Sequence, residues 1–223
     1  MKTFMEPLEE LKEYNSIRQD LTLKETPIHV AGCIDSQKCH LISGLSKNYK
    51  WKLIVTYNDI KAKEIYEDYK LYSKNVWLYP AKDVIFYSAD IRGNAIVKDR
   101  LHVLKQLIEA EEATIITTID AGLDRILPLE YIKKRILTID VAKTLDLEKL
   151  KVELVHLGYE RCGQVGGPGE FAIRGGIIDI FPLTEECPYR IELWDDEVDT
   201  IRMFDISSQR SIENVESVAI YPA

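Results

Sequence analysis

Eight residues near the amino terminus, Gly32-Cys-Ile-Asp-Ser-Gln-Lys-Cys39, match part of the pattern of a nucleotide-binding phosphate loop. In G-x-x-x-x-G-K-[ST], glycine lets backbone amides surround the phosphate, lysine neutralises it, and the hydroxyl binds magnesium. Gly32 and Lys38 stand in register, but Gln37 replaces the second glycine and Cys39 replaces the hydroxyl residue. A thiol is a poor ligand for hard Mg²⁺, and glutamine does not readily adopt glycine conformations. We therefore predict a degenerate phosphate loop that binds no ATP, and we expect no cofactor.

A second candidate site lies on the strand predicted over residues 189–194, where an apolar face alternates with a charged face. The charged face carries Arg190, Glu192 and Trp194. A tryptophan in this setting indicates a protein partner, because binding hot spots favour Trp, Tyr and Arg. Alternatively, Trp194 packs under a loop and Arg190 pairs with Glu192 or a nearby aspartate, an exposed pair worth about 0–1 kcal/mol. The residues alone leave both interpretations open.

The stretch from Gly169 to Pro182 predicts a β-hairpin that carries a further arginine, Arg174. Its turn is Gly175-Gly176, since glycine adopts positive φ readily. Side chains alternate along the first strand, so Ala172 and Arg174 share one side. The second strand, 177–181, is apolar enough on both sides to lie centrally in a sheet. From pattern alone, an ordinary core hairpin is the simpler explanation.

The other reactive side chains form no pattern that indicates catalysis or metal binding. The histidines, at positions 29, 40, 102 and 156, stand at no telling distance from a nucleophile or a second ligand. No paired-carboxylate site can be argued. The cysteines, at positions 33, 39, 162 and 187, include no C-x-x-C pair, so we expect reduced thiols rather than a disulfide framework.

Length and composition indicate a globular protein. A chain of 223 residues with 46% hydrophobic content can bury a sizeable core in one domain or two small ones. No apolar run reaches the ~18–20 residues that a membrane span needs. The acidic start of the chain lacks the basic-then-apolar form of a signal peptide. We therefore expect a cytoplasmic protein without membrane contact.

Charge is distributed unevenly along the chain. Residues 136–223 hold 8 Lys and Arg against 17 Asp and Glu, a net of −9, whereas the first 135 residues net +1. Phosphate affinity comes from clustered Lys and Arg, so the acidic carboxyl-terminal part is a poor binder of the DNA backbone. The net negative charge of residues 136–223 therefore favours a module that contacts proteins.

Strands and helices alternate in the first part of the chain. We expect a leading helix from Pro7 to Tyr14, strands at 28–31, 52–57, 76–79 and 114–119, and helices at 58–72 and 95–110. The strand at 52–57 is expected to be buried. This alternation implies a parallel, doubly wound sheet. Asp120 follows a strand, and we interpret it as a helix cap rather than a Walker B carboxylate. The aperiodic segment 81–93, with Phe86, Tyr87 and Arg92, predicts a surface loop.

The second part of the chain begins near Ile136. One helix over 145–158, capped by Asp146 and closed by Gly158, precedes a run of short strands with turn residues between them. That order is typical of an α+β domain. We therefore divide the chain into a degenerate P-loop-like α/β domain, residues 1–135, and a smaller α+β domain, residues 136–223.

Three segments, Gly169–Pro182, Tyr189–Asp205 and Ser208–Ile212, closely resemble the amino-terminal region of the bacterial transcription-repair coupling factors (Mfd). That region is itself similar to the first part of the excision-repair protein UvrB. The resemblance covers essentially the whole chain. It implies a first domain similar to a RecA-type fold that has lost nucleotide binding, and a second domain similar to domain 2 of UvrB.

The resemblance also implies a docking site for the damage-sensor protein UvrA. Arg174 matches the family's arginine before the Gly-Gly-type turn, and Arg190 and Trp194 match the arginine and aromatic of the next strand. Arg161 matches an arginine after a Gly-Tyr pair. The second hairpin arginine of UvrB falls on Ala172, a departure expected to weaken or reshape the contact. The two strand arginines would pair with UvrA carboxylates, and the indole would cover an apolar patch.

The resemblance implies a catalytically inert module that recruits UvrA to transcription-coupled nucleotide excision repair. RNA polymerase, DNA and ATP-driven translocation would belong to other parts of a parent protein. Two alternatives stay open. A piece of UvrB itself should have an intact phosphate loop and a long DNA-gripping hairpin. A small P-loop-derived enzyme should have the Ser/Thr and Walker B carboxylate that are missing here.

Overall fold

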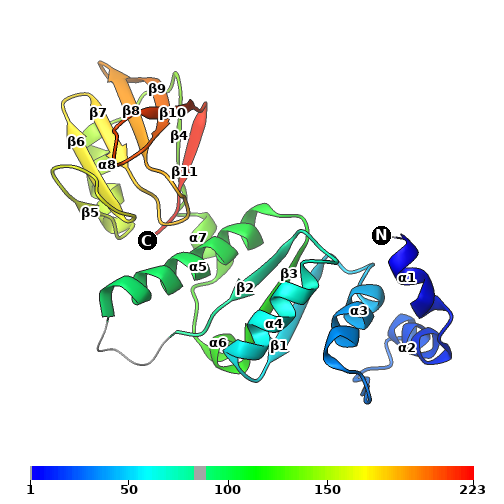
Figure 1. The fold of residues 1–223 in the computed structure, drawn as a ribbon. Coiled ribbons are helices and arrows are strands. Elements are labelled where there is room, and N and C mark those ends of the chain that lie inside the picture. Colours follow the sequence, from blue (N-terminus) through cyan, green and yellow to red (C-terminus); the bar gives the residue numbers. More distant parts are fainter. Residues whose placement is uncertain (1, 83–88) are drawn as a thin grey trace. The chain divides into compact units, whose positions relative to one another are not determined.

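The computed structural model describes residues 2–82 and 89–223, and the chain forms two compact units, Met1–Asp124 and Arg125–Ala223 (Figure 1). The predicted fold class is confirmed: the first unit is built on a parallel sheet, and the second is a smaller α+β unit. The division of the functional domains between residues 135 and 136 stays a prediction.

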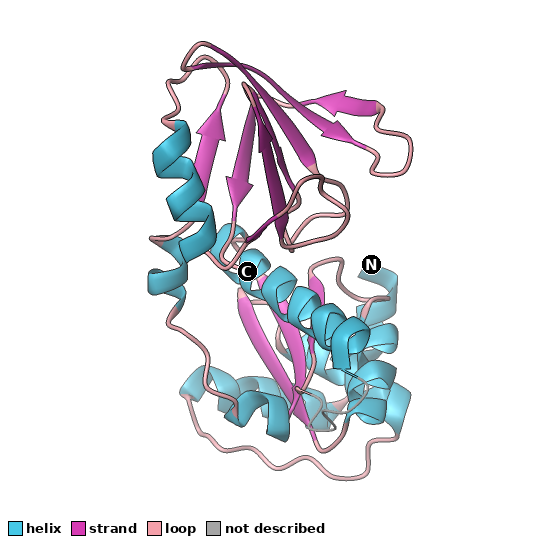
Figure 2. Ribbon diagram, turned by 90° about the vertical axis from the view of Figure 1, so that its left-hand side faces the viewer, coloured by secondary structure: helices cyan, strands magenta, loops and turns pink. Residues whose placement is uncertain are grey.

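The first unit is organised around a three-stranded parallel sheet in the order β1-β3-β2. Its elements are α1 (Lys2–Glu9), α2 (Lys12–Leu23), α3 (Asp35–Leu45), β1 (Trp51–Thr56), α4 (Asp59–Tyr69), β2 (Val76–Tyr79), α5 (Ala89–Glu109), β3 (Ala113–Thr118) and α6 (Ile119–Leu123). The central strand β3 is buried along its whole length. Tyr69 of α4 clusters with Ile116 on one face, and Val103 of α5 clusters with Ile115 on the other. The long helix that crosses the parallel sheet in Figure 2 is α5. Both faces of β3 are thus covered, as expected for a parallel sheet.

Three predictions for this unit are wrong. Residues 28–31 form no strand and lie in an irregular, largely exposed segment, because so short an apolar run needs a paired neighbour to become a strand. The leading helix is two helices, because α1 starts before Pro7 and ends at Glu9, and the extended backbone of Leu11 separates it from α2. Strand β1 is an edge strand rather than a buried one, with Leu53 and Val55 exposed.

Other expectations in this unit differ in detail. Helix α5 begins at Ala89 rather than at residue 95. The cap of α6 is Thr118, whose hydroxyl accepts from the Ala121 amide at 3.2 Å, and Asp120 lies exposed in the first turn. Phe86 and Tyr87 of the predicted 81–93 loop lie outside the described residues, as does the side chain of residue 92.

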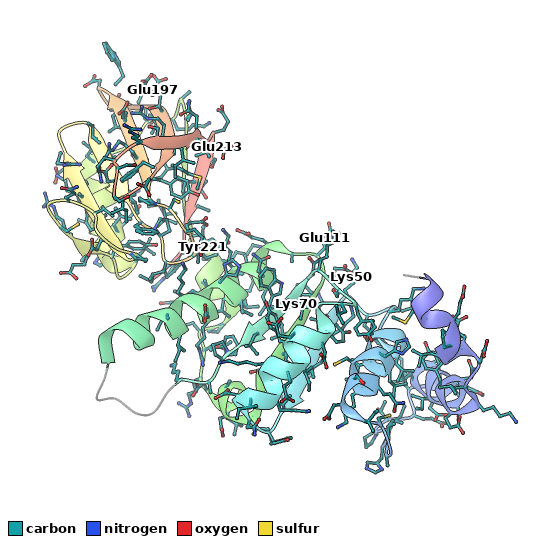
Figure 3. The ribbon with its side chains drawn as sticks, viewed as in Figure 1. Lys50, Lys70, Glu111, Glu197, Glu213 and Tyr221 are labelled. Atoms are coloured by element: carbon teal, nitrogen blue, oxygen red, sulfur yellow. The ribbon has the colours of Figure 1, made fainter. Side chains whose placement is uncertain are left out.

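The second unit packs one helix and a two-stranded ladder against a six-stranded sheet in the order β10-β9-β8-β7-β6-β5 (Figure 1). Its elements are α7 (Leu129–Lys133), β4 (Leu137–Asp140), α8 (Leu147–His156), β5 (Glu160–Arg161), β6 (Glu170–Arg174), β7 (Ile177–Ile180), β8 (Tyr189–Trp194), β9 (Glu197–Phe204), β10 (Ser211–Asn214) and β11 (Ser217–Ile220). Leu150 and Leu154 of α8 join Ile139 and Ile220 of the β4–β11 ladder in one core with the inner side chains of the sheet. Tyr159 joins the segment after β11 to this core by donating to the Tyr221 carbonyl at 2.9 Å. Tyr221 is labelled in Figure 3.

The predicted hairpin is formed by β6 and β7, with Arg174 opposite Ile177 next to the turn. Gly175 adopts a φ of +60°, which favours glycine. Gly176 is favoured for another reason: a Cβ there would lie 3.2 Å from the carbonyl oxygen of Leu193 on β8, a tight contact. Strand β7 lies between β6 and β8, so its predicted central place in the sheet is confirmed.

The predicted cap of α8 is confirmed, because one carboxylate oxygen of Asp146 accepts from the amides of Glu148 and Lys149 at 3.0 Å each. We expect Asp146→Ala to lower the free energy of unfolding by about 1 kcal/mol in urea denaturation followed by circular dichroism. Asp146→Asn keeps an acceptor at the cap and should lower it much less. Equal losses for the two variants would contradict the capping role.

Candidate functional site

The sheet of the second unit has one face against α8 and an opposite face that is rich in charge. This opposite face, defined here as the outer face, carries Arg174 of β6, Asp179 of β7, Arg190, Glu192 and Trp194 of β8, and Arg202 of β9. Strand register brings them together, because Asp179 lies opposite Arg190, and Arg190 lies opposite Arg202. Directly opposite residues point to the same side of a sheet. The alternation predicted for residues 189–194 is confirmed, since Tyr189, Ile191 and Leu193 pack in the core.

A buried carboxylate lies at the centre of the outer face. The side chain of Asp179 is only 2% exposed. Arg190 donates to it through Nε at 2.7 Å and through Nη2 at 2.9 Å, and Arg174 donates through Nη2 at 2.8 Å. The hydrogen bonds that Arg190 donates to Asp179 raise the pKa of Arg190 above its usual range. Two guanidinium groups therefore share one carboxylate, and the cluster keeps a net positive charge.

Further contacts fix Arg190. Its guanidinium carbon lies 4.4 Å from the centroid of the Phe204 ring, a cation–π distance. Its Nη2 also donates to Oε1 of Gln209 at 2.9 Å. Hydrogen bonds on two sides and a ring beneath leave this side chain little freedom, and it is only 19% exposed.

A tight turn after β9 places Gln209. The Asp205 carboxylate accepts from the hydroxyls of Ser207 and Ser208 and from the Ser208 amide, and these hydrogen bonds lower the pKa of Asp205 to about 2. Gln209 then adopts a left-handed φ of +58°. Because the folded pKa is depressed, the contribution of this turn to stability is present above the ordinary aspartate pKa and is lost as the pH falls toward 2.

Trp194 and Arg174 are the accessible members of the outer face. Trp194 is 81% exposed, so the alternative in which it packs under a loop is wrong. Its neighbour in strand register across the β8–β9 hairpin is Glu197, which is labelled in Figure 3. The side chain of Arg174 is 50% exposed, and Ile177 beside it is 38% exposed. Trp194 stands four residues along β8 from Arg190, a separation of about 13 Å.

A second ion pair lies on the same face. Arg190 and Arg202 stand directly opposite each other, an arrangement that is destabilising for unpaired like charges. Each has its own acidic partner, because Arg202 pairs with Glu192 while Arg190 pairs with Asp179. The alternative predicted for Arg190, a nearby aspartate, is therefore realised with Asp179, and Glu192 serves the other arginine.

Arg161 does not join this cluster. It lies on the short edge strand β5, exposed, in parallel register with Phe171. Phe171 packs in the core on the side of the sheet that faces α8, whereas Cys162 packs with Ala172 on the opposite side. By register and alternation, Arg161 falls on the face opposite Arg174. The structure thus gathers three of the four predicted docking residues on one face and places the fourth elsewhere.

Sequence reasoning missed Asp179 and Gln209. Asp179 did carry a signal, since an aspartate within an apolar central strand must find a cationic partner to be buried. The strand 177–181 was predicted to be apolar on both sides, and this residue is the exception. Gln209 carried no signal, because its contact with Arg190 depends on the turn that precedes it.

Ion pairs engage the charged side chains of the predicted degenerate phosphate loop. Asp35, in the first turn of α3, pairs with Lys38 at 3.2 Å and with Lys61 of α4 at 3.0 Å. Hydrogen bonds from Lys61 and Lys38 lower the pKa of Asp35. A carboxylate thus lies in the first turn of α3, the end of a helix that favours negative charge, and it already pairs with Lys38.

The two substituted positions of the loop have structural roles. Gln37 accepts from the Ile34 amide at 3.3 Å, so its side chain uses a donor that a phosphate would need. Cys39 is buried in the core cluster of the first unit, and burial raises the pKa of its thiol. Gly32 does adopt a positive φ, +86°, but in an irregular segment rather than after a strand.

Across residues 2–82 and 89–223, no group of three or more His, Cys, Asp or Glu is arranged to hold a metal ion. All four cysteines are free thiols. None of the helices that the structure describes combines the length and apolar character that crossing a membrane requires.

The second unit is similar to a known domain family. The sequence model of the family described as "UvrB interaction domain" matches residues 137–223, which include the whole six-stranded sheet and both strands of the β4–β11 ladder. The outer face, with its exposed indole and paired guanidinium groups, lies entirely within this match.

The wider chain is similar to transcription-repair-coupling factors. It is 36% identical to that of Bacillus subtilis over 197 residues, 87% of this chain and 17% of the relative. It is 34% identical to that of Staphylococcus epidermidis over 199 residues, 88% and 17%, and 31% identical to that of Haemophilus influenzae over 154 residues, 69% and 13%. The resemblance recognised in the sequence is therefore confirmed: the chain is a relative of the coupling factors that spans less than a fifth of their length.

Proposed function

We propose that this chain is the UvrB-like module of a transcription-repair coupling factor, and that it recruits UvrA to transcription-coupled nucleotide excision repair in the cytoplasm. Residues 136–223 would be the docking domain and residues 1–135 a degenerate P-loop-like domain without ATPase activity. The parent protein would be an ATP-dependent DNA translocase that displaces stalled RNA polymerase and contacts DNA through other parts.

One observation supports this proposal above the others: Arg174 and Arg190 converge on Asp179 on the same outer face as the 81%-exposed Trp194. Exposed tryptophan and arginine are the residues that most often dominate binding energy. Guanidinium groups recognise carboxylates through paired, charge-assisted hydrogen bonds. In this proposal UvrA supplies acidic side chains to the arginines and an apolar patch to the indole.

A titration of purified UvrA against the 223-residue chain tests the proposal. We expect saturable binding that weakens as salt is raised, since exposed charge pairs are screened. The same titration with a chain of residues 1–135, checked for folding by circular dichroism, should give no binding. A folded full chain that fails to bind UvrA would contradict the proposed function.

Nucleotide binding separates a docking module from an enzyme. Asp35 pairs with Lys38, the Ile34 amide donates to Gln37, and Cys39 is buried. We therefore expect no binding of Mg·ATP in calorimetry on this chain. A folded, intact P-loop protein in the same buffer is the positive control. Saturable binding in the micromolar range would show that the loop is functional.

Arg161 can be tested independently of the outer face. Because it lies on the opposite side of the sheet, a contribution to UvrA binding would come from a separate contact. We expect the losses from Arg161→Ala and Arg174→Ala to add within about 0.5 kcal/mol in the double variant, as distant sites do. A strongly non-additive result would mean that UvrA couples the two faces.

A further inference from the structure

We propose that Asp179, assisted by Gln209, is the positioning residue of the outer face, the docking surface in the proposed function. It sets the direction in which the guanidinium groups of Arg174 and Arg190 meet a partner. This inference rests on the proposed function, because it concerns how the same face binds UvrA. Asp179 itself is almost fully buried and has little surface to offer a partner. It would act only through Arg174 and Arg190.

The geometry of the donors supports this role. An arginine has five N–H groups in a rigid planar fork. The hydrogen bonds that the structure describes use Nε and Nη2 of Arg190 and Nη2 of Arg174, all toward Asp179 or Gln209. The three bonds of Arg190 orient its guanidinium plane, and the bond of Arg174 anchors one end of its guanidinium group beside Arg190. A partner carboxylate would meet donors that are already oriented.

The charges support it as well. Two guanidinium groups that approach one point repel each other unless a carboxylate lies between them. Asp179 offsets one of the two charges, so the cluster stays positive on a domain that is acidic overall. Without it, Arg174 would be free to move away from Arg190, and the partner would have to order both side chains on binding.

The variant Asp179→Asn keeps the shape of the side chain and removes its charge. In a UvrA titration of the full chain, we expect binding at least about tenfold weaker than wild type, the loss typical of a charged hydrogen-bonding group. Leu154→Ala is the matched control, since it removes core volume from the α8 side and leaves the outer face intact. Its affinity should equal that of wild type. A folded Asp179→Asn chain with wild-type affinity would overturn the inference.

A double-variant cycle gives a readout that a merely structural role would not move. If Asp179 acts through Arg174, then Arg174→Ala should cost far less in the Asp179→Asn background than in wild type, whereas independent roles would give additive losses. Additive losses would overturn the inference. If Asp179→Asn does not fold, Gln209→Asn decides instead, because asparagine tolerates the left-handed backbone but is too short to reach Arg190. We expect it to weaken binding by roughly threefold, and unchanged affinity would overturn the inference.

The outcomes separate this inference from the proposed function. If neither Arg174→Ala nor Trp194→Ala weakens UvrA binding, the docking face itself is wrong, and the inference fails with it. If both weaken binding while folded Asp179→Asn does not, the docking face stands and only the positioning role is wrong.

Discussion

We expect the double variant Arg174→Ala with Trp194→Ala to bind UvrA much more weakly than wild type does. Truncating a hot-spot residue typically costs at least about 2 kcal/mol, which corresponds to roughly 30-fold in affinity, and the double variant removes two such residues. Both are accessible: Trp194 is 81% exposed and the Arg174 side chain 50% exposed. Their removal should therefore change the binding surface much more than the fold.

Titration of UvrA against wild type, both single variants and the double variant measures this effect, with circular dichroism to confirm folding. Trp51→Ala is the matched control, because Trp51 is also exposed on a strand but belongs to the first unit. It should bind as wild type does. If the folded double variant also binds as wild type does, the outer face is not the docking surface.

Asp179→Ala should cause the largest loss of stability among substitutions on the outer face. Removing one partner of a buried ion pair costs about 3–5 kcal/mol, because the remaining charges lose their compensation. Here the loss leaves Arg174 and the largely buried Arg190 without their shared carboxylate. For a domain of about 100 residues, each kcal/mol lowers Tm by about 4–8 °C, so the second unit should melt at least about 12 °C lower.

Thermal unfolding followed by circular dichroism measures this loss. Arg174→Ala is the comparison variant, since Asp179 keeps both hydrogen bonds from Arg190, and we expect it to lower the free energy of unfolding by only about 1 kcal/mol. Replacing all three charged residues with apolar ones of similar volume should restore stability, because apolar packing often equals or exceeds a buried ion pair. Equal losses for Asp179→Ala and Arg174→Ala would contradict the central role of the carboxylate.

Local patterns in the sequence determined much of the second unit. The Gly175-Gly176 turn, the alternation of β8 and the Asp146 cap each depend on a few consecutive residues, so they could be predicted directly. The charged face of β8 was predictable for the same reason. The family could be recognised because long segments resemble it in residue identity, and that recognition supplied Arg174, Arg190 and Trp194 as a set.

Only the tertiary structure decided which of these residues meet. Arg174 and Arg190 belong to different strands and come together because β7 lies between them and presents Asp179 to both. Arg161 is closer to Arg174 in sequence than Arg190 is, yet the parallel pairing of β5 with β6 puts Arg161 on the opposite face. The same limit explains the missing strand at 28–31 and the exposed edge at β1. Strand pairing and register are set by contacts between distant segments, and a local pattern of residue types does not contain them.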